Sequence, residues 1–303
     1  MATKAPARPS EFFSFYGGKV KLEKKPWGDH FRFIKNGEKG GMFSASAITK
    51  YLDKSGALLP WAIGLVGGHV RLCAERAETF SRDEILLIVE EAVLKPEEGK
   101  TKGGKTGDII HDFAHAFGKS KKFGTPTPKL PKLSDFEEGH ITEEDLDRSL
   151  NGINAFLDWY NSHNVEFLEM EQTVYYNSLL AGDSNKDEPV VEYAGILDCI
   201  ARIDGKIKVL DYKTGKRVYT DQRYQLAGYA KAWNSNPDNK GKFAVGFEVL
   251  NFSKDTGELN PVDISLEGME KDFSAFRGLY FVACREKELE AERVALNKIR
   301  VIN

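Results

Sequence analysis

Residues 193–213 read YAGILDCIARIDGKIKVLDYK, and this stretch decides the fold of the chain. The dipeptide Asp204-Gly205 separates two apolar runs, which strongly indicates a β-hairpin with a two-residue type I′ turn. In that register the residues beside the turn pair with each other, and counting back along both strands places Asp198 opposite Asp211. The chain is therefore predicted to contain two largely apolar strands with two carboxylates facing each other.

The facing carboxylates indicate a metal site. Directly opposed residues have Cβ atoms about 5 Å apart, so two negative charges placed there repel each other unless a cation lies between them. Lys213 follows Asp211 by two positions and so lies on the same face of its strand. Carboxylate oxygens suit Mg²⁺ or Mn²⁺, and such a site suits chemistry on a phosphate. The alternative, two unrelated surface aspartates, fits poorly with the apolar residues around Asp198 and Asp211.

Patterns on both sides of the hairpin predict an α/β fold. Upstream the chain is mostly helical, with a capping box at Ser81 and Glu84. Downstream, strands alternate with two helices, so we expect a mixed central β-sheet flanked by helices. We expect residues 1–105 to form a helical N-terminal cap or channel region and residues 106–303 to form the core. The predicted strands are 165–176, 193–203, 207–212, 243–252 and 259–265, and the predicted helices are 43–59, 60–70, 81–94, 106–117, 142–161, 220–233 and 266–299.

Composition sets wider limits. The chain has 303 residues, 41% of them hydrophobic, and a net charge of −3, which is ordinary for a globular protein. No apolar run is long enough to cross a bilayer, and Met1–Ser10 has no apolar signal core. The three scattered cysteines, Cys73, Cys199 and Cys284, fit a reducing compartment and argue against a disulfide framework or an iron–sulfur cluster. We expect a cytoplasmic protein of a bacterium or a phage-infected host rather than a mitochondrial one.

The net charge hides a segregation along the chain. Residues 99–132 carry eight Lys against two acids, whereas residues 133–171 carry eleven acids against one Arg. The basic stretch is rich in Gly, Pro and Thr, so we expect flexible cationic loops that touch phosphates near the carboxylate pair. We expect the acidic helix 142–161 to face away from it. The candidate DNA-binding residues are Lys100, Lys102, Lys105, Lys119, Lys121 and Lys122.

Four short motifs, in order along the chain, resemble the signature of the RecB-type PD-(D/E)xK nucleases. GDIIH at 107–111 matches a G-x-x-x-H pattern, and GILD at 195–198 matches G-x-x-D. DYK at 211–213 matches D/E-x-K, and QLAGY at 225–229 matches Q-x-x-x-Y. Each motif alone is weak, but the ordered set is specific. The resemblance covers about two thirds of the chain and implies a restriction-endonuclease-like core.

The resemblance also implies roles for single residues. Gln225 and Tyr229 share a helix face and would orient the lysine or the scissile strand. Glu171 resembles an upstream strand acid of the family, which contacts the metal site or anchors the sheet. His115 lies one turn after His111, but the glycine spacing favours His111. The implied metal ligands are Asp198, Asp211 and His111, the implied catalytic lysine is Lys213, and Gln225, Tyr229 and Glu171 complete the implied site.

Within the family, the spacing is most similar to mitochondrial genome maintenance exonucleases and phage-encoded single-strand DNA exonucleases. The resemblance therefore implies a DNA exonuclease that favours single-stranded ends and uses one or two Mg²⁺ or Mn²⁺ ions, with no iron–sulfur cluster. Alternatives are a non-catalytic DNA-binding or assembly subunit and a sequence-specific endonuclease. A P-loop ATPase is a minor alternative, because GKTKGGKT at 99–106 has the right residues but follows a capped helix instead of a buried strand.

Overall fold

The centre of the molecule is a five-stranded mixed sheet, as the sequence predicts. The computed structural model describes residues 9–27, 30–38, 41–52, 54–76, 79–184, 187–254 and 256–302. The strands lie in the order β4-β5-β6-β7-β8, and all neighbours are antiparallel except the parallel pair β6 and β7. These strands are β4 (Val165–Asn177), β5 (Glu192–Ile203), β6 (Lys206–Lys213), β7 (Gly246–Phe252) and β8 (Leu259–Ser265).

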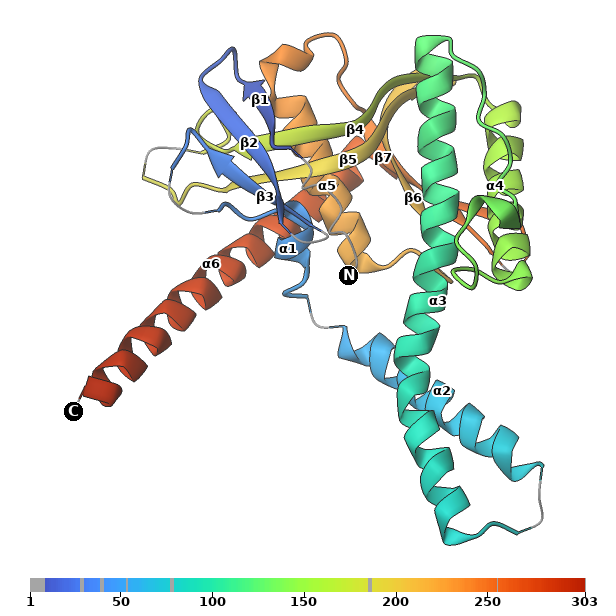
Figure 1. Cartoon of the computed structure of the whole chain (residues 1–303). Coiled ribbons are helices and arrows are strands. Elements are labelled where there is room, and N and C mark those ends of the chain that lie inside the picture. Colours follow the sequence, from blue (N-terminus) through green and yellow to red (C-terminus); the bar gives the residue numbers. More distant parts are fainter. Residues whose placement is uncertain are drawn as a thin grey trace.

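Helices cover both faces of this sheet (Figure 1). Helices α1, α5 and α6 share one apolar core with the sheet, and α3 and α4 share another on the opposite face. Helix α5 is the crossover between the parallel strands β6 and β7, which cannot be joined by a tight turn. The helices are α1 (Ala45–Thr49), α2 (Ser55–Ala74), α3 (Arg82–Phe123), α4 (Glu143–Ser162), α5 (Thr220–Ser235) and α6 (Leu266–Ile302), with short 3₁₀ turns at Leu133–Asp135 and Pro237–Asn239.

The hairpin between β5 and β6 has the predicted turn and register. Asp204 and Gly205 have φ values of 48° and 85°, the two positive values that a type I′ turn requires. The paired residues run back from the turn as far as Cys199 opposite Leu210. The next position along this register brings Asp198 level with Asp211, so the carboxylates lie where the ladder between β5 and β6 ends.

The N-terminal region is not mostly helical as predicted, because residues 11–35 form a separate antiparallel sheet. Its apolar side chains, including Phe15, Leu22 and Phe33, pack against Tyr175 and Ala194 of the central sheet. Alternation of polar and apolar residues in this segment is the sequence signal for these strands. The three strands are β1 (Glu11–Phe15), β2 (Val20–Trp27) and β3 (His30–Lys35).

Helix α3 corrects a second prediction. The capping box of Ser81 and Glu84 starts it as expected, but the helix then runs for 42 residues through the segment that was expected to be a loop. Extending an existing helix is favourable once it is nucleated, and here the second half of the helix is packed in the core, so Pro96 and the internal glycines do not break it. A continuous helix also excludes the P-loop at residues 99–106, which requires a loop after a strand. The expected domain boundary at residue 105 lies inside this helix.

The expected position of the acidic helix is also wrong. Helix α4 lies beside α3 on the same face of the sheet, and its apolar residues, such as Ile153 and Phe156, share the core with Ile110 of α3 (Figure 1). The strong apolar stripe of α4 explains this placement, since burying that stripe outweighs the charge of the exposed face. Its acidic side chains Glu143 and Glu144 line a cleft of about 770 Å³ against α3, together with Lys105.

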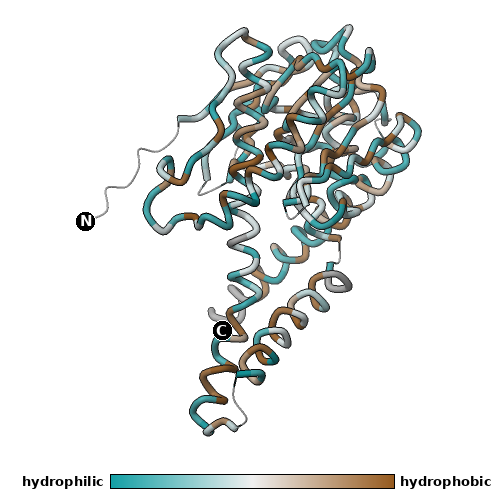
Figure 2. Tube along the Cα trace, turned by 90° about the vertical axis from the view of Figure 1, so that its right-hand side faces the viewer, coloured by the Kyte–Doolittle hydropathy of each residue, from teal (hydrophilic) through white to brown (hydrophobic). Residues whose placement is uncertain are grey.

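Helix α2 and the first half of α3 form a helical hairpin that projects from the central sheet (Figure 1). Figure 2 shows hydrophobic segments along both of its helices. None of the described helices combines the length and the apolar character needed to cross a membrane. Apolar residues at least 40% exposed on this hairpin are Leu58, Leu59, Ile63, Val70 and Leu72 of α2, and Ile85, Leu86, Leu87, Val89, Val93 and Leu94 of α3.

Candidate active site

Asp198 lies near the middle of β5 and connects three elements. Its Oδ2 atom lies 2.9 Å from Nε2 of His111 on α3 and accepts a hydrogen bond of 3.1 Å from the backbone N–H of Tyr212 on β6. Burial alone would raise the pKa of this carboxyl, but the hydrogen bond from His111 and the charges of His111 and Lys213 lower it. Asp198 is therefore held as a carboxylate in the interior.

Asp211 and Lys213 lie two residues apart on β6 and form an ion pair. Asp211 is only 3% exposed, and its burial, together with the charge of Asp198, raises its pKa to about 6 despite the opposing effect of Lys213. Burial would lower the pKa of Lys213, but the two aspartates raise it. The two carboxylates and the ammonium group predicted from the hairpin therefore interact electrostatically in the folded chain.

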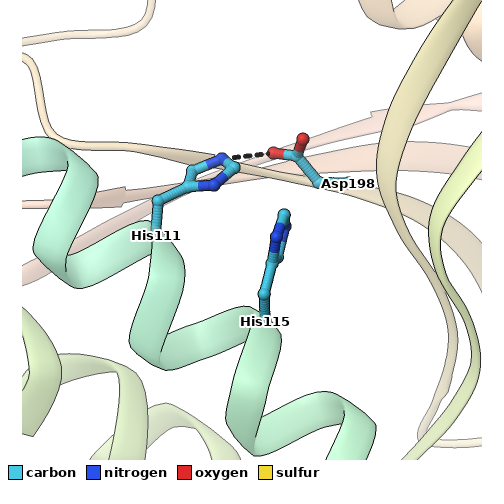
Figure 3. A group of neighbouring side chains, drawn as sticks. All are labelled: His111, His115 and Asp198. Atoms are coloured by element: carbon cyan, nitrogen blue, oxygen red, sulfur yellow. Dashed lines mark hydrogen bonds and ion pairs between the residues drawn. The ribbon is translucent and has the colours of Figure 1, made fainter. Parts of the chain in front are cut away.

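His111 and His115 approach this group from α3. They lie one turn apart on the helix, with ring centroids 4.4 Å apart, and both rings pack edge-on against Tyr212. One ring nitrogen of each histidine and a carboxylate oxygen of Asp198 all lie within 4.8 Å of one another, and Figure 3 shows both side chains on the side of α3 that faces Asp198. The prediction that favoured His111 over His115 missed one member of this group, although the i, i+4 spacing of HDFAH signals a shared helix face.

Gln225 and Tyr229 lie on α5, on the opposite side of the sheet. The side-chain amide of Gln225 donates a hydrogen bond of 2.7 Å to the hydroxyl of Tyr229, whose ring is 6% exposed. Burial raises the pKa of Tyr229, so it stays neutral. A Cβ atom at Gly195 would lie 2.4 Å from this ring, so the glycine of GILD is required for Tyr229 to reach β5 three residues before Asp198.

The glycine of GDIIH has a similar explanation. A Cβ atom at Gly107 would lie 2.8 Å from the hydroxyl of Thr214, the residue after Lys213. Gly107 thus lets α3 approach the end of β6, which brings His111 within hydrogen-bonding distance of Asp198. Both motif glycines bring helices close to the strands that carry the acidic residues.

Glu171 sits on β4 at an irregular position opposite Asp198. Its φ of 49° is in the left-handed region, which is unusual for a strand residue that is not glycine. Its carboxylate lies 3.2 Å from Nδ1 of His115 and forms an ion pair with Lys119. The hydrogen bond with His115, helped by Lys119 and opposed by burial, lowers the pKa of Glu171 to about 2. Glu171 therefore contacts the site through His115.

The candidate DNA-binding lysines whose side chains are described all lie on α3 instead of on loops. Lys119 and Lys122 extend the face of His111 and His115, but they pair with Glu171 and Glu169 of β4. The ammonium group of Lys121 lies over the rings of Phe117 and Tyr160. Lys105 donates to the backbone carbonyl of His140, Lys100 lies 3.6 Å from Glu97, and the side chain of Lys102 lies outside the described residues.

The chemistry of this site fits a divalent metal ion. Imidazole nitrogens and a carboxylate oxygen converge within bonding range of one ion, and the charge of Asp198 raises the pKa of the neighbouring carboxyl of Asp211. A cation placed between the two carboxylates would relieve that repulsion, so these residues fit a divalent metal ion.

Comparisons with known proteins identify the class. A family model of the PD-(D/E)XK nuclease superfamily matches residues 86–296, and the chain belongs to this superfamily. Nucleases of this superfamily use divalent metals to hydrolyse phosphodiester bonds. No curated protein matches the chain. Among solved structures, a crystal structure of SSO0001 is similar with 15% sequence identity and a TM-score of 0.25, covering 45% of this chain and 65% of that one.

Proposed function

We propose that this protein is a metal-dependent DNA exonuclease of the RecB-like branch that acts on single-stranded ends. The observation that carries the proposal is the convergence of His111, Asp198, Asp211 and Lys213 from three different elements onto one place. Three of the four ordered motifs supply these residues, and the fourth supplies Gln225 and Tyr229. The proposal extends the superfamily assignment to a substrate and a mode of cleavage.

The burial of Asp211 and His115 supports a single-stranded substrate. Asp211 is 3% exposed and His115 is 8% exposed, so the reacting phosphate has to come close to a recessed site between α3 and the sheet. A single strand bends sharply at each nucleotide, whereas duplex DNA is stiff over about 150 base pairs. A flexible strand therefore reaches such a site at a lower cost in deformation energy.

The side chains of the site would have different roles in hydrolysis. Asp198, Asp211 and His111 would hold one or two Mg²⁺ or Mn²⁺ ions, which supply Lewis-acid stabilisation of phosphate charge and lower the pKa of a bound water. Lys213, kept protonated by the two aspartates, neutralises negative charge that develops on the phosphate. Gln225 and Tyr229 hold the sheet and α5 together beneath Asp198, and so orient this strand.

End-labelled linear DNA and circular DNA, each single- and double-stranded, test the proposal directly. With Mg²⁺ or Mn²⁺ we expect progressive shortening of linear single strands, no cleavage of circles, and no reaction with EDTA. Asp211→Asn and Lys213→Ala should abolish cleavage while retaining the circular dichroism spectrum of the wild type. Cleavage of circles as fast as linear strands would refute the exonuclease, and DNA binding without cleavage would favour the assembly subunit.

The cellular setting is part of the same proposal. The three cysteines are free thiols, and Cys199 is buried. Free thiols are typical of proteins in reducing compartments. We therefore propose that the enzyme acts in the cytoplasm of a bacterium or a phage-infected host.

A further inference from the structure

We propose that His115 is a fourth metal-binding side chain of this site, beside Asp198, Asp211 and His111, that Glu171 is its positioning residue, and that the resulting pair of imidazoles makes the site prefer Mn²⁺ to Mg²⁺. This inference rests on the proposed metal-dependent nuclease function and deepens it. It concerns the part of the site that lies outside the four motifs.

His115 has one nitrogen that lacks a partner. The residue is 8% exposed, and its Nε2 atom has no hydrogen-bond partner among the described residues. Leaving a buried polar atom without a partner costs about 1–3 kcal/mol. The same ring lies 4.4 Å from that of His111 and contributes a nitrogen to the group around Asp198, so a cation in this group would satisfy it.

Glu171 sets the orientation of this ring. Its carboxylate lies 3.2 Å from Nδ1 of His115, so Nδ1 carries the hydrogen of the neutral ring and donates a hydrogen bond to Glu171. The lone pair is then left on Nε2, the nitrogen without a partner. Metal-binding histidines commonly donate their second nitrogen to a carboxylate in this way, which fixes both the tautomer and the ring orientation.

The backbone of β4 supports a dedicated role for Glu171. A residue other than glycine with a φ of 49° costs about 1–3 kcal/mol, and such conformations concentrate at functional sites. The register of β4 with β5 pairs Met170 with Cys199 and Gln172 with Leu197, which leaves Glu171 opposite Asp198. The unusual backbone conformation thus occurs at the residue of β4 that lies opposite Asp198.

The ligand atoms determine which metal ion the site prefers. Mg²⁺ strongly favours oxygen ligands and retains water, whereas imidazole suits first-row transition ions. A site with two imidazoles beside its aspartate carboxylates should therefore bind Mn²⁺, and also Co²⁺, more tightly than Mg²⁺. A site with His111 as its only imidazole would show a weaker preference.

Calorimetric titration of the full chain with MnCl₂ or MgCl₂, without DNA, tests this inference. We expect wild type to bind Mn²⁺ at least about 10-fold more tightly than Mg²⁺. His115→Ala and Glu171→Gln should each weaken Mn²⁺ binding by about 10- to 100-fold and reduce the preference over Mg²⁺. The control His163→Ala removes a histidine whose ring contacts Trp159 at the end of α4, and it should not change either affinity.

A spectroscopic measurement keeps the inference testable even if His115→Ala does not fold. Electron spin-echo modulation of bound Mn²⁺ detects directly coordinated nitrogen, and in His111→Ala the remaining ¹⁴N signal should come from His115. Absence of that signal, or unchanged Mn²⁺ affinity in folded His115→Ala, would overturn the assignment of His115. Because no DNA is present, either result leaves the nuclease proposal to be decided by the cleavage assay.

Discussion

The two halves of α3 have opposite environments although they form one continuous helix. In the first half, Ile85, Leu87 and Val93 are each at least 50% exposed, whereas in the second half Ile110 is fully buried and Phe117 is 4% exposed. Both halves have apolar residues at helical spacing, so periodicity does not separate them. The two halves differ in the elements that pack against them. The second half packs between α4 and the sheet, whereas among the described elements only α2 lies beside the first half. The candidate site lies entirely beside the second half.

Cleavage should show the largest contrast between the halves. His111→Ala removes a candidate ligand in contact with Asp198, and we expect the rate of single-strand cleavage to fall by about 10³-fold. Leu87→Ala, in the exposed first half, should leave the rate unchanged. Single-turnover digestion of a labelled oligonucleotide measures both, and equal rates for His111→Ala and wild type would remove His111 from the site.

Stability should show the next contrast. Ile110→Ala deletes a side chain that is 0% exposed and should lower the free energy of unfolding by about 2–5 kcal/mol. Leu87→Ala deletes a side chain that is 55% exposed and should change it by less than about 0.5 kcal/mol. Urea denaturation of the two variants checks this pair. A large loss for Leu87→Ala would mean that the first half is covered in solution.

Two glycines three residues apart in α3 give a finer test. A Cβ atom at Gly104 meets nothing within 4 Å, so Gly104→Ala should stabilise the helix by about 0.5–1 kcal/mol. At Gly107 the new Cβ atom would lie 2.8 Å from the hydroxyl of Thr214. Gly107→Ala should therefore stabilise the protein less than Gly104→Ala does, and it should slow cleavage. Thermal melts measure the stability of both variants, and the cleavage assay is a second readout. Equal stabilisation of both variants, with unchanged cleavage, would mean that helix propensity alone acts and that the contact with Thr214 has no effect.

The ion pairs made by the two halves of α3 should differ in how their contribution to stability depends on pH. Glu169 pairs with Lys122 at the end of α3 and with Lys242, and although burial opposes them, these partners lower its pKa. A lowered pKa in the folded state means stability that is present above the unfolded pKa, about 4.3, and is lost as the pH falls through the folded pKa. Glu169→Gln should therefore destabilise by about 0.5–1 kcal/mol at pH 7 and by much less near pH 3.

The control for this pH effect is Glu98→Gln, which removes the exposed pair of Lys95 and Glu98 in the first half of α3. We expect no measurable loss of stability from it at pH 7 or pH 3, because exposed pairs contribute little. Denaturation curves of both variants at the two pH values measure the difference. A loss for Glu169→Gln that is equally large at pH 3 would assign it to packing instead of charge.

The smallest expected effect concerns binding. Lys121, near the end of the second half, has its ammonium group over two aromatic rings, and Lys121→Ala should weaken binding of single-stranded DNA by about 3-fold. The slope of log K against log salt should also fall by about 0.7. Lys100→Ala, in the projecting hairpin, should change neither quantity. Fluorescence anisotropy at several salt concentrations, with EDTA to prevent cleavage, measures both.

Much of the central sheet was predictable from local patterns. Asp204-Gly205 specified the turn, the turn specified the register, and the register brought Asp198 and Asp211 together. The cap of α3 was also readable, because a capping box depends on residues three positions apart. Composition misled for residues 99–107, where glycine and lysine suggested a loop, because composition does not report what packs on either side of a segment.

The sequence by itself determined the hairpin, the order of the strands and helices from residue 142 onward and the motif residues, since each depends on neighbours in the chain or on a fixed spacing. Only the tertiary structure decided that α3 is continuous, that its halves differ in burial, and that His115 joins the candidate site through its contact with Glu171. Glu171 and His115 are 56 residues apart, and their contact depends on how α3 packs against β4. Packing of that kind is set by the whole set of surfaces that must be buried together, and no local pattern contains it.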